Sequence, residues 1–268
     1  MTRPTGSYLR LTTGIFLAAG AMASPLAAQD KPDMIVMIGV GPALQPKYPG
    51  ASSLVLAAKP VVNFWRKGDP LPAKAADQSP GFVVLGQRGG LAAGPAVTFA
   101  PGRNGKDIAP GLADVGFGME VGGFIEAYPW EHLRLRGELR RAIGASKGLT
   151  GDVAIDLELR LPDDRLVVTA GPRLRWGNGR YQRAYFGVDA AEALTSGLTS
   201  HRPGSGVHAY GAMTGAYYQF GRTWGVYAFA GYDRLTGDAA RSPIVTHKGS
   251  RDQFSTGLSL TYRVTIGP

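Results

Sequence analysis

The segment Asp152–Asp164 alternates apolar and charged side chains with a period of two residues. Its odd positions from Val153 to Leu161 are all apolar. The even positions carry charges at Asp152, Asp156, Glu158 and Arg160. Successive side chains of a β-strand point to opposite faces, so this segment predicts a long strand with one apolar face and one ionic face.

The neighbouring segments repeat this pattern. His132–Gly144 places leucines on one face and arginines on the other, and Gly144–Gly151 predicts an antiparallel hairpin to the segment described above. In that pairing, arginines meet carboxylates as cross-strand neighbours. The apolar and polar positions change parity in 165–176. The predicted charge network of the polar faces comprises Arg134, Arg136, Glu138, Arg140, Asp152, Asp156, Glu158, Arg173 and Arg175.

The composition excludes several classes of function. The chain of 268 residues has no cysteine, so it has neither disulfides nor thiolate zinc sites. Its formal net charge of +9 is dispersed and includes no block of lysine and arginine. We therefore predict no nucleic-acid partner.

The N-terminal segment has the features of a secretory signal peptide. Arg3 and Arg10 precede the apolar stretch Leu11–Ala23, and small residues follow it. This stretch of 13 residues is shorter than the roughly 20 that a spanning helix needs, which argues against an uncleaved anchor. We predict a signal peptide at 1–29, cleaved between Ala23 and Gln29, and a single exported domain at 30–268.

The length of the strands separates the two remaining fold classes. A soluble periplasmic β-protein would bury the apolar faces, whereas a transmembrane β-barrel would turn them towards lipid. Long strands favour the second class, and so do aromatic residues near the predicted strand ends, as in an interfacial girdle. Those residues are Trp65, Tyr128, Trp130, Trp176, Tyr217, Tyr218 and Trp224. We predict an all-β fold, a transmembrane antiparallel β-barrel in the outer membrane of a Gram-negative cell, in contact with outer-membrane lipid and closed on itself.

The barrel is expected to have twelve strands, or ten if two of the segments are merged with their neighbours. The predicted strands are 34–44, 52–66, 80–87, 90–100, 113–128, 131–142, 152–161, 165–176, 181–192, 206–220, 223–235 and 252–265. Tight links such as 161–165 and 219–224 are expected on the periplasmic side. The longer polar segments 66–81, 193–206 and 237–252 are expected to be extracellular loops.

Several blocks carry a resemblance to a known family. "GVGPALQPKYPGASS" (39–53), "GRNGKDIAPGLADVGFGMEVG" (102–122), "YQRAYFGVDAAEALTSGL" (181–198) and the block 233–264 resemble, in order, the signatures of the MltA-interacting protein (MipA/OmpV) family. The loop residues that carry the resemblance are Pro46, Tyr48, Pro49, Gly50, Gly237, Asp238, Ser242 and Pro243.

The resemblance implies an outer-membrane scaffold. Members of the family are thought to tether a murein-degrading lytic transglycosylase to a murein synthase, so that cleavage and insertion of peptidoglycan occur together. Other members are described as porin-like proteins or adhesins, which is the alternative reading for this chain. The partners implied are therefore a lytic transglycosylase and a murein synthase.

The residues themselves predict little chemistry. The four histidines, His132, His201, His208 and His247, are scattered, so we predict no metal site and no cofactor. A Ser205–His208 pair near the rim is the one weak candidate for nucleophilic catalysis, and we predict no enzyme. The charges of the lumen allow a water-filled pore, but a salt-bridged plug is favoured because buried charges persist when they are paired.

Overall fold

The computed structural model describes residues 33–69, 71, 73–87, 89–161 and 165–267. The predicted signal peptide, 1–29, lies outside these residues. In the described ranges, no helix is long and apolar enough to cross a membrane.

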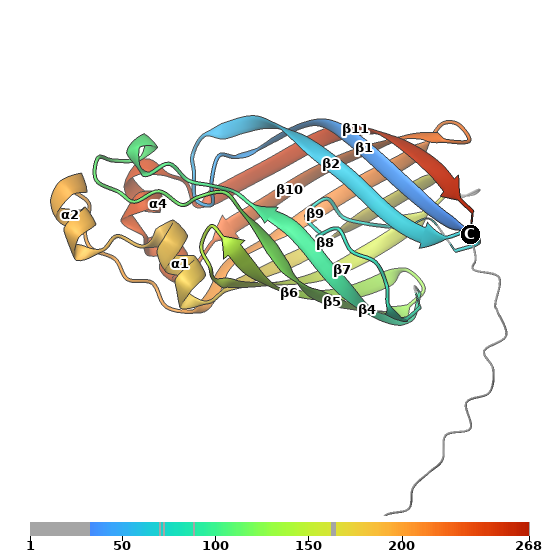
Figure 1. Cartoon of the computed structure of the whole chain (residues 1–268), viewed down its shortest axis with the longest axis horizontal. Coiled ribbons are helices and arrows are strands. Elements are labelled where there is room, and N and C mark those ends of the chain that lie inside the picture. Colours follow the sequence, from blue (N-terminus) through green and yellow to red (C-terminus); the bar gives the residue numbers. More distant parts are fainter. Residues whose placement is uncertain (1–32, 70, 72, 88, 162–164, 268) are drawn as a thin grey trace, which may run out of the picture. The chain divides into compact units, whose positions relative to one another are not determined.

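Eleven antiparallel strands form one curled sheet (Figure 1). The strands are β1 (Met34–Pro46), β2 (Leu54–Arg66), β3 (Leu85–Gly86), β4 (Leu91–Ala100), β5 (Gly118–Trp130), β6 (Leu133–Gly144), β7 (Leu149–Arg160), β8 (Leu166–Gly177), β9 (Gly206–Gln219), β10 (Trp224–Leu235) and β11 (Asp252–Ile266). Their order in the sheet is β2-β1-β11-β10-β9-β8-β7-β6-β5-β4-β3. From β3 to β11 each strand pairs with the next one in sequence, and β1 pairs with both β2 and β11.

One of the twelve predicted strands is wrong, and another is much shorter than predicted. The segment predicted at 181–192 forms α1 (Gly179–Phe186) and α2 (Ala190–Ser196). The Asn178 side chain caps α1, and α2 begins with a capping box between Asp189 and Glu192. These polar residues satisfy the free backbone N–H groups at the start of each helix, so local capping outweighs the apparent alternation.

The segment predicted at 80–87 contributes only the two residues of β3. Upstream of β3, Gly81 forms an isolated bridge with Ala96 of β4. The sheet therefore has eleven strands in the described chain, and one of them is vestigial.

The two faces of the sheet have the arrangement predicted for a transmembrane barrel. On β7, Leu157 is 47% exposed on the outer face, whereas the adjacent Asp156 is 0% exposed on the inner face. The same holds on β6, where Leu139 is exposed and Arg140 is buried. Because apolar groups face outwards and paired charges face inwards, the outer surface is matched to lipid and not to water.

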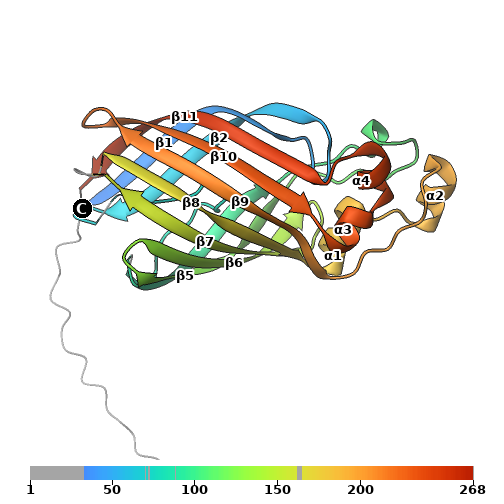
Figure 2. The same ribbon diagram turned by 180° about the vertical axis from the view of Figure 1, so that it is seen from behind.

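The connections at the two ends of the sheet differ in length. The start of β1 pairs with the end of β11 at the end where the turns 131–132 and 220–223 are short. The opposite end carries the long connections, with α1, α2, α3 (Gly237–Arg241) and α4 (Pro243–Lys248) (Figures 1 and 2). In bacterial barrels the short turns are periplasmic and the long loops extracellular.

The segment 66–81 was predicted to be an extracellular loop, and this is wrong. β2 ends at the short-turn end, and residues 73–79 then lie in the lumen, inside the sheet in Figure 1. There Lys74 Nζ donates to the Val62 carbonyl (3.2 Å), and the Tyr227 hydroxyl donates to the Lys74 carbonyl (3.1 Å). We name residues 73–79 the inserted segment. The segment is polar because its side chains contact the charged residues that line the lumen.

The predicted closure of the barrel is incomplete. The sheet ends at β2 and β3, and in the described residues β2 has no backbone pairing with β3 or β4. The chain between β2 and β4 enters the lumen and does not cross the wall as a full strand. This leaves a lateral seam between β2 and β4.

The aromatic residues form a girdle only in part. Trp130, Tyr218 and Trp224 are exposed near the short-turn end, as expected of interfacial anchors. Trp65 and Tyr217 instead face inwards and pack with Met37 in an apolar cluster of the lumen. The prediction is wrong for these two residues. A position near a strand end indicates only how deep a residue lies in the membrane, whereas the alternation along the strand decides whether its side chain faces lipid or the lumen.

Candidate functional site

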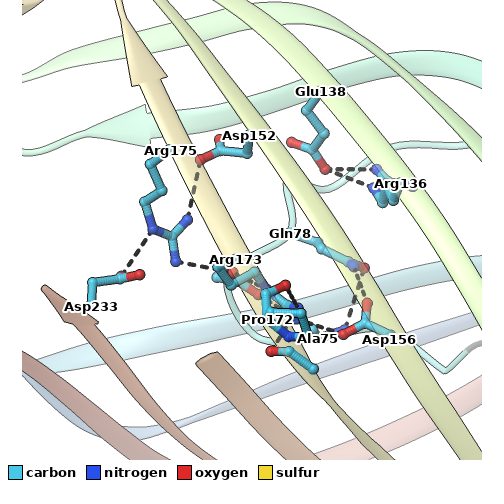
Figure 3. A network of polar contacts seen from close by, with 12 residues as sticks. Ala75, Gln78, Arg136, Glu138, Asp152, Asp156, Pro172, Arg173, Arg175 and Asp233 are labelled. Atoms are coloured by element: carbon cyan, nitrogen blue, oxygen red, sulfur yellow. Dashed lines mark hydrogen bonds and ion pairs between the residues drawn. The ribbon is translucent and has the colours of Figure 1, made fainter. Parts of the chain in front are cut away.

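All nine residues of the predicted charge network face the lumen, and each has an ion pair of opposite sign. β6, β7 and β8 supply them in a ladder, with Arg134 opposite Asp156 and Asp152 opposite Arg175 in the register. Figure 3 shows part of this ladder together with the inserted segment. The parity of the strands therefore suffices to place these side chains.

Asp156 lies at the centre of the network. Its carboxylate is within 2.8 Å of both Arg134 Nη2 and Arg173 Nη2, and it accepts a hydrogen bond from Gln78 Nε2 at 3.1 Å. Arg134 also approaches Glu158, at 3.3 Å. The side chains of Arg134, Asp156 and Arg173 are at most 2% exposed, so this one carboxylate helps to compensate two buried guanidinium groups.

The arginines of β6 pair with glutamates of their own strand and of β5. Arg136 lies 2.8 Å from both Glu126 and Glu138, and Arg140 lies 3.1 Å from Glu120. Arg140 also pairs with Glu138 and Asp152. The Arg136 guanidinium stacks over the Phe124 ring at 3.8 Å. These contacts tie β5, β6 and β7 together inside the barrel.

Arg175 of β8 extends the network past β9 to β10. Its nitrogens lie 2.9 Å from Asp233 on β10 and 3.2 Å from Asp152 on β7 (Figure 3). A third contact, of 3.1 Å, is with Asp77 in the inserted segment. Asp77 is also 2.8 Å from Arg173. The inserted segment is therefore held in the lumen by two arginines of β8.

Sequence reasoning left four carboxylates out of this network: Asp77, Glu120, Glu126 and Asp233. Glu120 and Glu126 lie on the polar face of the predicted strand 113–128, and Asp233 has the inward parity of Tyr227 in β10. The alternation of inward and outward positions along the strands could therefore have identified Glu120, Glu126 and Asp233. No local signal marks Asp77, because its segment does not belong to a strand.

The family-motif loops meet at the long-loop end, where they form a cap with the helices. The Gly50 N–H donates to Gln253 Oε1 (2.9 Å), and Gln253 Nε2 donates to the Ala51 carbonyl (3.0 Å). Gly50 has φ +94°, and an added Cβ would lie 2.9 Å from Val245 Cγ2 on α4, so this position favours glycine. Pro46 ends β1, Pro49 follows in the loop, Gly237 begins α3 with φ +58°, and Pro243 begins α4.

Two further motif residues hold the cap from within. Tyr48 is buried in an apolar cluster with Val188 and Ile244, and this burial raises the pKa of its phenol. Ser242 Oγ donates to the Phe186 carbonyl at the end of α1 (2.7 Å) and accepts from the Ile244 N–H (3.2 Å). The motif loops thus pack together and hydrogen-bond with one another in the cap, although they lie far apart in sequence.

The candidate catalytic pair does not assemble. Ser205 Oγ accepts a hydrogen bond from the Gly179 N–H, whereas His208 stacks against Tyr181 with ring centroids 5.0 Å apart. His201 Nε2 lies 2.9 Å from the Asp238 carbonyl. Across the part of the chain that the structure describes, no three histidine or acidic side chains are grouped as metal ligands would be.

Comparison with known proteins identifies the family. The family described as MltA-interacting protein MipA matches residues 38–264. This chain belongs to the MltA-interacting protein family. It is 29% identical over 138 residues to the MltA-interacting proteins of Escherichia coli K12 and of Shigella flexneri. The alignment covers 50% of this chain, and the chain spans 54% of the length of each relative.

Among solved structures, this member of the MltA-interacting protein family is similar to outer-membrane proteins of low sequence identity. The translocator domain of the autotransporter NalP from Neisseria meningitidis is 16% identical with a TM-score of 0.42, over 89% of this chain and 91% of that chain. An outer membrane channel from Pseudomonas putida F1 is 10% identical with a TM-score of 0.45, over 88% and 97%.

A serine of the family motif provides a test of the cap. We expect Ser242→Ala to destabilise the cap by about 1–3 kcal/mol, because the buried Phe186 carbonyl loses its donor. Limited proteolysis of the folded barrel should then cut the 178–205 connection faster. Ser52→Ala, which removes only an exposed hydroxyl of the same cap, is the control and should leave the cleavage rate unchanged.

The cap should also respond to acid through Asp238. The hydrogen bond from the Gly204 N–H (2.9 Å) lowers the pKa of this carboxyl, and Arg241 lowers it further. A lowered folded-state pKa contributes stability above the unfolded pKa, and this contribution is lost as the pH falls through the folded value. The protection of the Gly204 amide, measured as its exchange rate relative to that of an unfolded chain at the same pH, should therefore fall on acidification to below pH 4 or so, where free aspartates also titrate. In Asp238→Asn the protection of the Gly204 amide should no longer change over this pH range. If the change with pH is the same as in the unmodified chain, Asp238 is not the group responsible.

Proposed function

We propose that this chain is a non-catalytic scaffold of the outer membrane that links a lytic transglycosylase to a murein synthase during cell-wall remodelling. The observation that carries the proposal is the filled lumen. The inserted segment contacts β2 and β10 through Lys74 and pairs with β8 through Asp77, so this segment and the paired charges occupy the path that a wide pore would need. Scaffolding then takes place on the outside of the barrel and at its ends.

The family supports the same function. The curated relatives are named for an interaction with MltA, and this chain spans about half of their length. Peptidoglycan enzymes act on the periplasmic side of the membrane, where the short turns are expected. We place the docking surface for the transglycosylase at this end, around the turns 131–132 and 220–223.

A pull-down tests the scaffold. The full chain, with an affinity tag and extracted in mild detergent, should capture a lytic transglycosylase and a murein synthase from the envelope of its own cells. Arg222→Glu at the short-turn end should reduce the capture, whereas the matched change Arg202→Glu in the cap should not, since both side chains are exposed. Capture of neither enzyme, together with robust conductance of the intact chain, would reject the scaffold.

A small-solute channel is the second candidate. The lumen contains a cavity of about 810 Å³ beside the inserted segment, lined in part by Arg175 and Asp233. If this cavity conducts, Arg173→Glu should shift the ion selectivity towards cations. A current that is absent or insensitive to this change would argue against the channel.

A further inference from the structure

The lateral seam between β2 and β4 is unusual for a barrel wall. β2 pairs with β1 along 13 residues, yet its other edge has no strand partner in the described chain. On the opposite side of the seam, the Val97 N–H of β4 donates to the Pro80 carbonyl. Beyond Val97, residues 98–100 of β4 have no backbone bridge on that edge in the described residues. Open sheet edges facing hydrocarbon are strongly disfavoured, so such an edge persists where it lines a cavity.

The lumenal cavity reaches this seam. Its lining includes Ala58 and Pro60 from the outer face of β2, and Val97 and Phe99 from the outer face of β4. The same cavity is lined by inward-facing residues such as Tyr227. Residues of both faces contribute to one cavity, so the cavity opens sideways through the wall into the apolar belt.

Lys59 is a cation of this cavity that does not belong to the charge network. Lys59 lies on the inner face of β2, with its ammonium 5.9 Å from the centroid of the Phe229 ring. In the described part of the chain it makes no ion pair, since the Asp77 carboxylate accepts hydrogen bonds from Arg173 and Arg175. An ammonium beside an apolar cavity selects a ligand that carries a negative charge on an apolar body.

We propose that the seam admits a long-chain fatty acid from the outer membrane into the lumenal cavity, with its carboxylate at Lys59 and its acyl chain along the seam. The volume of about 810 Å³ lies within the range of roughly 300–1,000 Å³ that small-molecule sites span. A single acyl chain enters between two strands more readily than a two-chain lipid, because the opening is bounded by two sheet edges. This site goes beyond the scaffold and does not depend on it.

Photolabelling of the full chain in bilayer nanodiscs tests the site. A palmitic acid analogue with a diazirine on a carbon close to its carboxylate should label residues 58–63 and 97–99 in preference to other lipid-facing positions. Unlabelled palmitate should compete for this labelling, whereas hexadecanol, which has the same chain and no charge, should compete at least tenfold less well. A diazirine phosphatidylcholine should label the outer face without this preference.

Two pairs of variants separate the head-group contact from the entrance. Lys59→Gln should abolish the preference for palmitate over hexadecanol, whereas Lys106→Gln in the exposed cap should not. Ala58→Trp should reduce the labelling several-fold by narrowing the mouth, whereas Ala170→Trp, an outward alanine of β8, should not. The change of gel mobility on heating confirms that each variant is folded. Uniform labelling of the outer face, equal competition by hexadecanol, or an unaltered preference in folded Lys59→Gln would each overturn the proposal.

Discussion

Asp156→Leu is expected to destabilise the barrel by about 3–5 kcal/mol, the cost of breaking a buried ion pair from one side. The change leaves Arg134 and Arg173 without the carboxylate that both contact at 2.8 Å, and neither guanidinium can reach water. It also removes the acceptor of Gln78, so the inserted segment is loosened. Urea unfolding in detergent micelles, followed by intrinsic fluorescence, measures the loss.

A compensating variant separates the charge effect from packing. Arg134→Met combined with Asp156→Leu should recover part of the lost stability, because one buried charge is removed along with its partner. Arg141→Gln, on the exposed face of β6, is the control and should change the stability by less than about 0.5 kcal/mol. If Asp156→Leu is as stable as the control, the network does not hold the barrel together.

Replacing the inserted segment, residues 73–79, with a short glycine-serine linker is expected to turn a silent barrel into a conducting one. This segment carries Asp77 and Gln78 into the lumen, where they contact Arg173, Arg175 and Asp156. Without it, the two arginines lose a partner and water enters the space. In planar bilayers the variant should give resolved current steps, whereas the intact chain should give none.

The same recordings can contradict this expectation. If the intact chain already conducts and the linker variant conducts no better, the inserted segment does not obstruct the lumen. Asp77→Asn is a milder variant for the case in which the linker variant does not fold. It keeps the segment and removes only its charge, and it should give brief openings rather than stable currents.

The sequence predicts the wall of the barrel because the alternation of side chains is a local property. On β6, β7 and β8 the inward charges lie at alternate positions of the strand. The register of the strands then brings Arg134 opposite Asp156. Nothing beyond strand parity and an antiparallel hairpin is needed to place these residues. The placement of the family blocks in loops follows in the same way, from glycine and proline at the ends of strands.

The parts that the sequence does not predict depend on contacts between distant residues. The inserted segment contains charged and polar residues, as an exposed loop would, and its place in the lumen depends on the contacts of Asp77 with Arg173 and Arg175, which are distant in sequence. Its entry removes a strand from the wall and opens the seam. The helices at 179–196 could have been recognised from Asn178 and from the spacing of Asp189 and Glu192, had capping been weighed above alternation.

The orientation of the wall, with apolar side chains towards lipid, is tested most directly by a cysteine scan of β7. The chain has no native cysteine, so each single variant carries one fluorescent label at a known position. In liposomes containing nitroxide lipids, labels at Val153, Ile155, Leu157 and Leu159 should be strongly quenched, and labels at Thr150 and Ala154 should not. Quenching that follows the opposite parity, or that shows no alternation, would contradict the account.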